Sequence, residues 1–331
     1  MENAELILLK ATNGELDVQW RHMSFSDFTL LKENEEAGDY KVVSWSGDRA
    51  SRVALWPNMS AQDPQLREFF NKFEVRQALS LAVDRNELNQ LFYFGLGVPR
   101  QLTAISGEPT YEADVASLYI EHDPDEANRL LDAAGYASRN ANGVRTFSDG
   151  KAISLLMEYA TSWPYMGDEG EVVCSHFQQV GIDCQVKPLE RAVWYQKSAA
   201  NEFGLVLFTS PGTSFSNNWW VVPSGAHNHR GYGDWYRSNG AEGEEPPEDM
   251  RRIMALFRSL GQAVDADEQV RILREVLRYK VENLWGIGLV GENPTIGIVR
   301  NAVGNVPERL PYTTGLMSPY NGMPEQWYFK N

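Results

Sequence analysis

Charged residues interrupt an apolar helical pattern in the stretch FEVRQALSLAVDRNEL, residues 73–88. Three of them, Arg76, Asp84 and Arg85, could act in two ways. They could form a catalytic set, or they could hold the helix to its neighbours through charge-assisted hydrogen bonds. A catalytic set needs an activated nucleophile or a group of metal ligands, and neither stands beside these residues in the sequence.

Two other chemistries are suggested by residue type but lack partners. Glu158 or Glu190, paired with another acid, could hydrolyse a glycoside. His227, Asn228 and His229 could offer two imidazoles to a metal, but no third ligand accompanies them. The sequence has no Gly-x-Ser-x-Gly elbow, phosphate-binding loop, HExxH or CxxC motif. We therefore predict no metal and no cofactor, and we keep a glycoside-acting enzyme as a competing function.

Aromatic and amide side chains gather in one long irregular stretch, residues 211–247, which holds several of the 10 tryptophans. Flat aromatic faces combined with neutral donors and acceptors suit a polyhydroxyl ligand such as a sugar. The alternative is that these rings pack the loop onto its own lobe. The candidate ligand-binding residues here are Asn217, Asn218, Trp219, Trp220, Trp235 and Tyr236.

A second candidate segment begins at the carboxyl end of the predicted strand GLVLFTS, residues 204–210, and continues beyond it. It contains Thr209, Ser210, Gly212 and Thr213. In α/β folds the ligand lies at the carboxyl ends of the strands. We therefore add these four residues to the candidate ligand-binding set.

Composition and charge exclude several classes of protein. The formal net charge of −15 argues against nucleic-acid binding, which needs clustered Lys and Arg. No apolar run approaches the length of about 20 residues needed to span a bilayer, and the N-terminus does not read as a signal peptide. The two cysteines, Cys174 and Cys184, could form one bridge, but we favour two partly buried free thiols.

Helices and strands alternate along the chain in a way that indicates an α/β fold. Asp63 with Pro64, and Asp123 with Pro124, are typical helix starts. Helices are predicted at 167–180 and 190–203, and strands at 182–189 and 204–210. Two further helices, at 247–264 and 266–283, precede a strand at 286–291.

Three motifs, in this order, resemble the dipeptide/oligopeptide-binding family of solute receptors for ABC importers. They are VRQALSLAVDRNELNQLFYFGLGVP (75–99), HDPDEANRLLDAAGY (122–136) and FQQVGIDCQV (177–186). WYRSNGAEGEEPPEDM and NVPE further resemble a branch that includes oligosaccharide binders. The resemblance implies a periplasmic-binding-protein-like lobe, a mixed sheet flanked by helices, with remnants of the first lobe.

The resemblance also implies boundaries and roles. Residues 1–55 would end the first lobe, 56–290 would form the second lobe, and 291–331 would return to the first, so the chain is expected to be a fragment. Asn58 and Asn293 would lie at the hinge. Trp194 stands where family members often carry a ligand-facing tryptophan, and the alternative is that it packs in the core. Arg76, Asp84 and Arg85 would belong to the framework of the second lobe.

The function implied by the resemblance is capture of an oligosaccharide or oligopeptide between two lobes and delivery to the membrane subunits of an ABC permease. The parent protein would be periplasmic or lipid-anchored at the cell surface. Peptide-binding relatives usually carry a tryptophan and then an aspartate where this sequence reads FTSPGTSFSNNWW. A buried ammonium without that acid is costly, so we favour the oligosaccharide. A peptide-capturing chaperone or sensor would use the same cleft.

Overall fold

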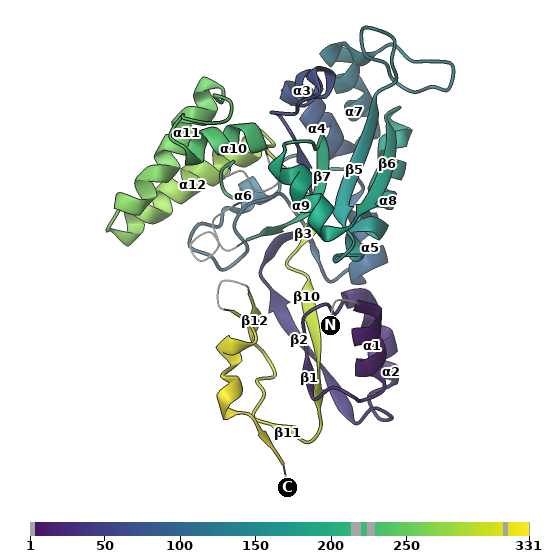
Figure 1. Ribbon diagram of the computed structural model, residues 1–331, viewed down its shortest axis with the longest axis vertical. Coiled ribbons are helices and arrows are strands. Elements are labelled where there is room, and N and C mark those ends of the chain that lie inside the picture. The colour runs from purple at the N-terminus through teal and green to yellow at the C-terminus, as the bar shows by residue number, and fades with distance from the viewer. Residues whose placement is uncertain (1–3, 213–219, 224–228, 314–316, 331) are drawn as a thin grey trace.

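The computed structural model describes residues 4–212, 220–223, 229–313 and 317–330. The described chain forms two bodies, one above the other in Figure 1. Of the described residues, those within 4–47 and 293–330 form the small body, and those within 49–292 form the large body. Each has its own sheet and its own buried apolar clusters. A mixed α/β architecture, as predicted, is confirmed.

The small body is built on a sheet of order β1-β10-β2-β12. Helices α1 (Ala4–Thr12) and α2 (Phe28–Glu33) pack with Ile296 and Ile298 of the sheet. A separate cluster contains Trp20 and Trp45, whose rings stack 4.2 Å apart. The strands are β1 (Val18–Gln19), β2 (Tyr40–Gly47), β10 (Pro294–Arg300) and β12 (Pro311–Tyr312), with β11 (Val303–Gly304) pairing with β13 (Tyr328–Phe329) nearby.

The large body is built on a five-stranded mixed sheet of order β6-β5-β7-β3-β8. Strand β5 lies between β6 and β7 and runs parallel to both, and β3 runs antiparallel to β7 and β8. Parallel pairing requires crossover helices, which α8 (Tyr165–Gln179) and α9 (Arg191–Ala199) supply. The strands are β3 (Arg49–Pro57), β5 (Ser154–Ala160), β6 (Asp183–Leu189), β7 (Leu205–Pro211) and β8 (Ile287–Gly288).

Helices cover this sheet and extend from it as an arm, at the upper left of Figure 1. The arm is formed by α10 (Arg230–Arg237), α11 (Glu248–Ser259) and α12 (Ala266–Glu282). The remaining helices are α3 (Pro64–Asn71), α4 (Phe73–Ala82), α5 (Arg85–Tyr93), α6 (Ala113–Ala116) and α7 (Pro124–Leu131), and β4 (Val98–Pro99) pairs with β9 (Val290–Gly291). None of the helices in the described ranges is long and apolar enough to cross a membrane.

Asp84 caps α5, and the two arginines bind backbone carbonyls. The Asp84 carboxylate accepts hydrogen bonds from the amides of Asn86 and Glu87 at 2.9 and 3.0 Å. Buried Arg85 donates to the carbonyls of Gly288 at 2.9 Å and Ser80 at 2.8 Å. Arg76 likewise donates to two backbone carbonyls. The framework role predicted for this stretch is confirmed.

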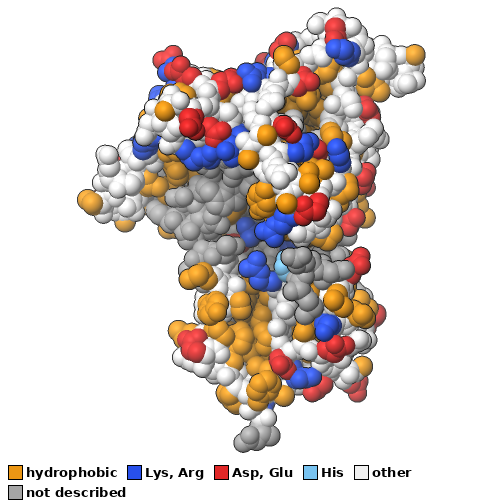
Figure 2. Space-filling model, in the orientation of Figure 1, with side chains coloured by type: hydrophobic (Ala, Val, Ile, Leu, Met, Phe, Trp, Pro, Cys, Tyr) orange, Lys and Arg blue, Asp and Glu red, His pale blue; other side chains and the backbone are white. Residues whose placement is uncertain are grey.

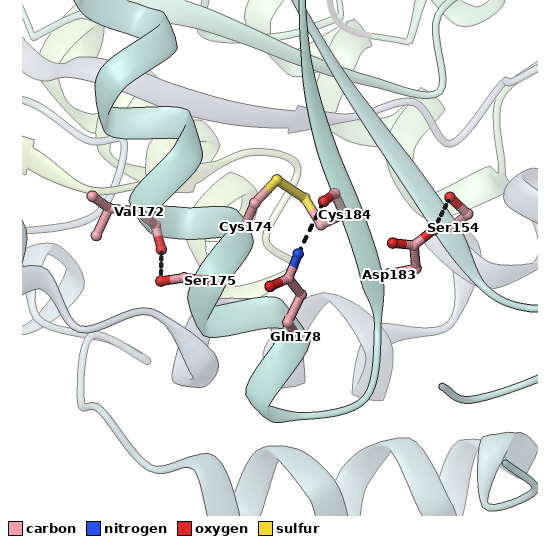
Figure 3. The surroundings of a disulfide bond; sticks show 7 residues. All are labelled: Ser154, Val172, Cys174, Ser175, Gln178, Asp183 and Cys184. Atoms are coloured by element: carbon pink, nitrogen blue, oxygen red, sulfur yellow. Dashed lines mark hydrogen bonds between the residues drawn. A yellow bond between two sulfur atoms is a disulfide. The ribbon is translucent and has the colours of Figure 1, made fainter. Parts of the chain in front are cut away.

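The two cysteines form a disulfide, so the preference for free thiols was wrong (Figure 3). Cys174 lies on α8 and Cys184 on the adjacent strand β6, with their Cα atoms 5.0 Å apart. The turn between α8 and β6, with Gly181 at a φ of 81°, brings the strand back along the helix. Burial alone, on which the sequence argument relied, does not distinguish a buried thiol from a buried bridge.

The chain passes between the two bodies at Asp48 and again at Glu292 and Asn293. The two crossing segments lie against each other: the backbones of Gly291 and Ala50 are so close that a Cβ on Gly291 would overlap the carbonyl oxygen of Ala50. Asn293 lies at the second crossing, and its role as a hinge residue stays a prediction. Asn58 instead lies at the opposite end of β3, within the large body.

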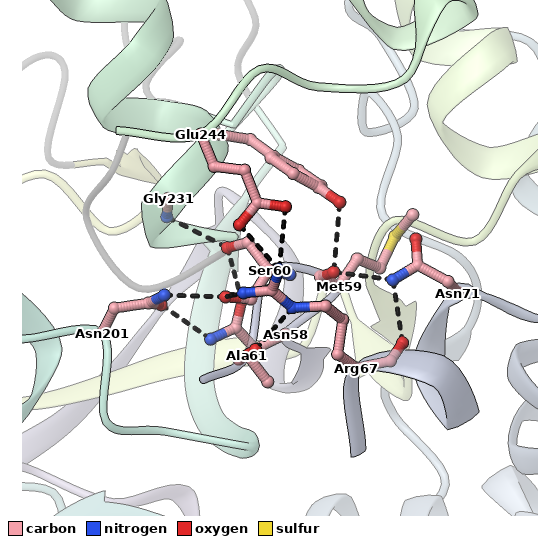
Figure 4. Close-up of polar contacts among 10 residues, drawn as sticks. Asn58, Met59, Ser60, Ala61, Arg67, Asn71, Asn201, Gly231 and Glu244 are labelled. Carbon is pink, nitrogen blue, oxygen red and sulfur yellow. Dashed lines mark hydrogen bonds and ion pairs between the residues drawn. The ribbon is translucent and has the colours of Figure 1, made fainter. Parts of the chain in front are cut away.

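Asn58 belongs to a polar network that joins the far end of β3 to α10 and α3 (Figure 4). Its side-chain amide donates to Asn201 Oδ1 and to the carbonyl of Phe203, both at 2.8 Å. Its Oδ1 accepts from the amide and hydroxyl of Ser60. These contacts tie Asn58 to other parts of the large body, whereas the crossings lie at the other end of the strand.

Candidate ligand-binding face

One edge of the large sheet meets the crossings. Because β5, β6 and β7 are parallel, their carboxyl ends lie at the same edge. The antiparallel strand β3 begins at that edge, where Arg49 pairs with Pro211 and Ser51 with Ser210. The segments that follow the three parallel strands therefore lie beside the path between the two bodies. We call this edge the crossing edge.

The predicted residues at the end of β7 lie at the crossing edge: Thr209 and Ser210 belong to the strand, and Gly212 follows it. The amide of Gly212 donates to the carbonyl of Asp48 at 2.8 Å, and its own carbonyl accepts from Ile105 at 3.0 Å. The Thr209 hydroxyl donates to the carbonyl of Ser51. Ser210 is fully buried. Thr213 lies outside the described residues. The structure thus brings this segment to the crossing, with its backbone already engaged.

Trp194 lies within the core of the large body, with no exposed surface. Its ring stacks on Phe208 at 5.4 Å and meets Trp163 edge-on at 6.0 Å. Trp163, which is only half-buried, also packs against Phe208 at 5.0 Å. Trp194 therefore supports the ring of Trp163, and of these two tryptophans Trp163 is the one that reaches the surface.

Two arginines at the crossing edge lie over aromatic rings that sequence reasoning missed. The Arg52 guanidinium lies 4.1 Å from the centre of the Tyr165 ring, and Arg191 lies 5.5 Å from that of Trp163 and 5.7 Å from that of Tyr195. Trp163 and Tyr165 follow the carboxyl end of β5. The rule that selected the segment after β7 would have found them if it had been applied to β5.

A buried carboxyl lies close to Arg52. Glu169 accepts a 2.5 Å hydrogen bond from the Tyr93 hydroxyl. Burial raises the pKa of Glu169 to about 7, although the Tyr93 hydrogen bond and the positive charge of Arg52 oppose that rise. This carboxyl titrates near neutral pH inside the large body, just behind the crossing edge.

The aromatic residues predicted in the long loop do not form one surface. Trp220 is fully buried, and the ammonium of Lys280 lies 4.1 Å from its ring centre. Trp235 and Tyr236 lie on α10 and line a groove of about 340 Å³ with Arg258 and other residues of α11. Asn217, Asn218 and Trp219 lie outside the described residues.

The groove on α10 and α11 is separate from the crossing edge. The amide of Gly231, in the first turn of α10, donates to Ser60 Oγ at 3.0 Å. Ser60 follows the end of β3 that is remote from the crossing. Trp235 and Tyr236 therefore belong to a different part of the large body from Thr209, Ser210 and Gly212.

The residues considered for metal or acid–base chemistry have structural partners. His229 accepts a hydrogen bond from the amide of Met59 and donates to the carbonyl of Trp285, and burial lowers its pKa to about 3. Its neighbours His227 and Asn228 lie outside the described residues. Within the described ranges, no group of three His, Cys, Asp or Glu side chains could hold a metal ion.

The two glutamates are likewise engaged. Glu158 is buried and accepts a 2.5 Å hydrogen bond from Lys197. The Glu190 carboxylate caps α9 by accepting from the amides of Ala192 and Val193 at 2.8 and 3.3 Å. Each contact gives its carboxylate a structural role.

Comparison with protein families finds one matching model. Residues 3–231 match the middle part of the bacterial extracellular solute-binding proteins, family 5. Among curated proteins, a periplasmic alpha-galactoside-binding protein of Rhizobium meliloti (strain 1021) is 21% identical over 282 residues. The match covers 77% of this chain and 37% of that protein.

Solved structures with the same architecture cover nearly the whole chain. The oligopeptide-binding protein OppA is 32% identical with a TM-score of 0.77, over 100% of this chain and 56% of that one. The periplasmic binding protein MelB of Agrobacterium fabrum C58, solved with stachyose, is 17% identical with a TM-score of 0.74. That match covers 92% of this chain and 47% of the MelB chain. The chain thus spans roughly half the length of these solved relatives, and less of the curated one.

Proposed function

The chain belongs to family 5 of the bacterial extracellular solute-binding proteins, and we propose that it forms the second lobe and part of the first lobe of a receptor for an ABC importer. In this proposal the large body, residues 49–292, is the second lobe, and the small body is the part of the first lobe. The receptor captures an oligomeric solute and presents it to the membrane permease. Its family is one of binding proteins, and we propose that this chain has no catalytic role.

The observation that carries this proposal is the position of the crossing edge. The carboxyl ends of β5, β6 and β7 open beside the two segments that join the bodies. A ligand held there would touch both bodies, so binding would favour their closed arrangement. The crossings at Asp48 and Asn293 would act as the hinge, and the permease would recognise the closed form.

Two observations support an extracytoplasmic location. The family is named for extracellular proteins. The Cys174–Cys184 bond is of a kind that persists in oxidising compartments. We propose that the parent protein works in the periplasm or at the cell surface.

We propose an oligosaccharide or an oligopeptide as the solute. The peptide reading draws on OppA, and the sugar reading on the alpha-galactoside-binding relative and on MelB with stachyose. The sequence favours the sugar, because the aspartate usual in peptide binders is absent from FTSPGTSFSNNWW.

A thermal-shift screen tests the proposal. Cello-, xylo-, manno- and galacto-oligosaccharides are compared with di- to pentapeptides. A solute at 100 times its Kd adds about 2.7 kcal/mol to the unfolding free energy by mass action. At least one class should raise the melting temperature and be recovered unchanged. A solute that is converted to product would instead favour the enzyme.

A further inference from the structure

Arginines gather at the crossing edge in a chain whose net charge is −15. Arg49 and Arg52 lie at the start of β3, Arg191 follows the carboxyl end of β6, and Arg21 follows β1 of the small body. Burial raises the pKa of Tyr312, and the positive charges of Arg21, Arg49 and Arg52 oppose that rise. Figure 2 shows Lys and Arg side chains collected at the waist between the two bodies.

Most other arginines of the described chain are held by carboxylates or carbonyls, but Arg52 and Arg191 are not. The contacts found for them within the described ranges are with the flat faces of aromatic rings. A guanidinium over the face of a ring is attracted by its charge, and its N–H donors can still bind a planar oxyanion with two parallel hydrogen bonds. Arg52 is half-buried and Arg191 is exposed, so both are within reach of a ligand.

The acids near these two arginines already have other partners. Asp48 pairs with Arg49 at 3.4 Å, and Glu190 caps α9. Asp27 accepts from the amide of Ser24 at 3.1 Å. Burial raises the pKa of Asp27, and the charge of Arg52 opposes that rise. Glu169 is bonded to Tyr93. These carboxyl groups therefore hydrogen-bond to other groups, and within the described ranges none of them is bonded to the N–H donors of Arg52 or Arg191.

The positive charge also reaches across the gap between the bodies. Burial lowers the pKa of His22, in the small body, and the charges of Arg21 and Arg191 lower it further. Arg191 belongs to the large body, so groups from both bodies share the same positive field. Like charges repel within a Debye length of about 8 Å, and an anion between them would relieve that repulsion.

We propose that the captured solute carries a carboxylate, which Arg52 and Arg191 bind at the crossing edge. This inference rests on the proposed solute-binding function and narrows its ligand to an acidic oligosaccharide or a peptide with a free C-terminus. Trp163 and Tyr165, each covered on one side by a guanidinium, fix the orientation of the two arginines.

The test compares matched probes on this chain by isothermal titration at constant ionic strength. Digalacturonate is paired with galactobiose, and trialanine with trialanine amide. In at least one pair, the compound with the free carboxylate (digalacturonate or trialanine) should bind at least about tenfold tighter than its neutral partner. A tenfold difference in Kd is about 1.4 kcal/mol. That preference should disappear in Arg52→Met and Arg191→Met. Arg52→Lys should restore only part of it, because an ammonium lacks the planar fork.

The control is Arg129→Met, an exposed arginine paired with Glu126 on α7, which should leave the preference unchanged. Equal binding of charged and neutral members, or a preference that survives in Arg191→Met, would overturn the carboxylate subsite while leaving the solute-binding function standing. The carboxylate subsite is also wrong if none of the four probes binds but a neutral solute from the wider screen does. If no solute in that screen binds, the proposed function fails with it.

Discussion

Reducing the Cys174–Cys184 bond should lower the unfolding free energy of the large body, by an amount that depends on the number of residues between the two cysteines. The bond joins α8 to β6 across 10 residues. In the chain-entropy model, closing a loop of that length removes about 9 cal/mol/K from the unfolded chain. At 25 °C this corresponds to about 2.7 kcal/mol of stabilisation. Both half-cystines are buried in the main apolar cluster, so reduction leaves the packing around them in place.

The assay is urea unfolding of the oxidised and reduced chain, followed by tryptophan fluorescence. The free energy of unfolding should fall by about 2.7 kcal/mol on reduction, and the slope against urea should rise because the reduced unfolded chain is less compact. The double variant Cys174→Ala/Cys184→Ala should not respond to reductant. It serves as the control for effects of reductant elsewhere.

Two results would refute this reasoning. Titration of two free thiols in the denatured, unreduced chain would show that the bond does not form. An unchanged unfolding free energy on reduction, in a chain whose bond does form, would show that loop closure contributes nothing here.

Three further predictions concern buried groups. The pKa of Glu169 is raised from 4.5 to about 7. The folded chain then holds a proton that the unfolded chain releases, so the unfolding free energy should fall by about 3 kcal/mol from pH 4.5 to 7. Glu169→Gln should abolish that pH dependence in urea titrations. Gly291→Ala should cost about 3 kcal/mol or more, because its Cβ meets the Ala50 backbone, whereas Gly261→Ala, with open space around it, should cost nothing measurable. Arg85→Met should cost at least about 3 kcal/mol by stranding buried carbonyls, judged by thermal unfolding, and a cost under 1 kcal/mol would contradict the framework role.

Local sequence patterns, such as helix-capping residues and hydrophobic periodicity, predicted many of the helices and strands. Asp63 and Asp123 cap helices with Pro at the next position, as the helix-start pattern indicated. The alternation from β5 to β7 was also readable, because apolar strands and amphipathic helices have different periods. The role of Arg85 followed from the lack of chemistry around it, and its partners at Gly288 and Ser80 confirm it.

Long-range geometry could not be read from the sequence. The sequence named Trp194 as a candidate for ligand contact and did not single out Trp163, and only packing against Phe208 shows that Trp194 is the enclosed ring. Asn58 and Asp48 are both near β3, but the direction of the strand decides which lies at the crossing. The gathering of Arg52, Arg191 and Arg21 depends on three separate elements, so no local pattern could reveal it.

The measurement that tests the central claim most directly is hydrogen exchange of this chain with and without the tightest solute from the screen. Bound solute should slow exchange at residues 48–52, 161–165 and 209–212, the segments of the crossing edge. Exchange in α10 and α11, where Trp235 and Tyr236 line the separate groove, should not change. Protection confined to that groove, or no protection at the crossing edge, would contradict the placement of the solute between the two bodies.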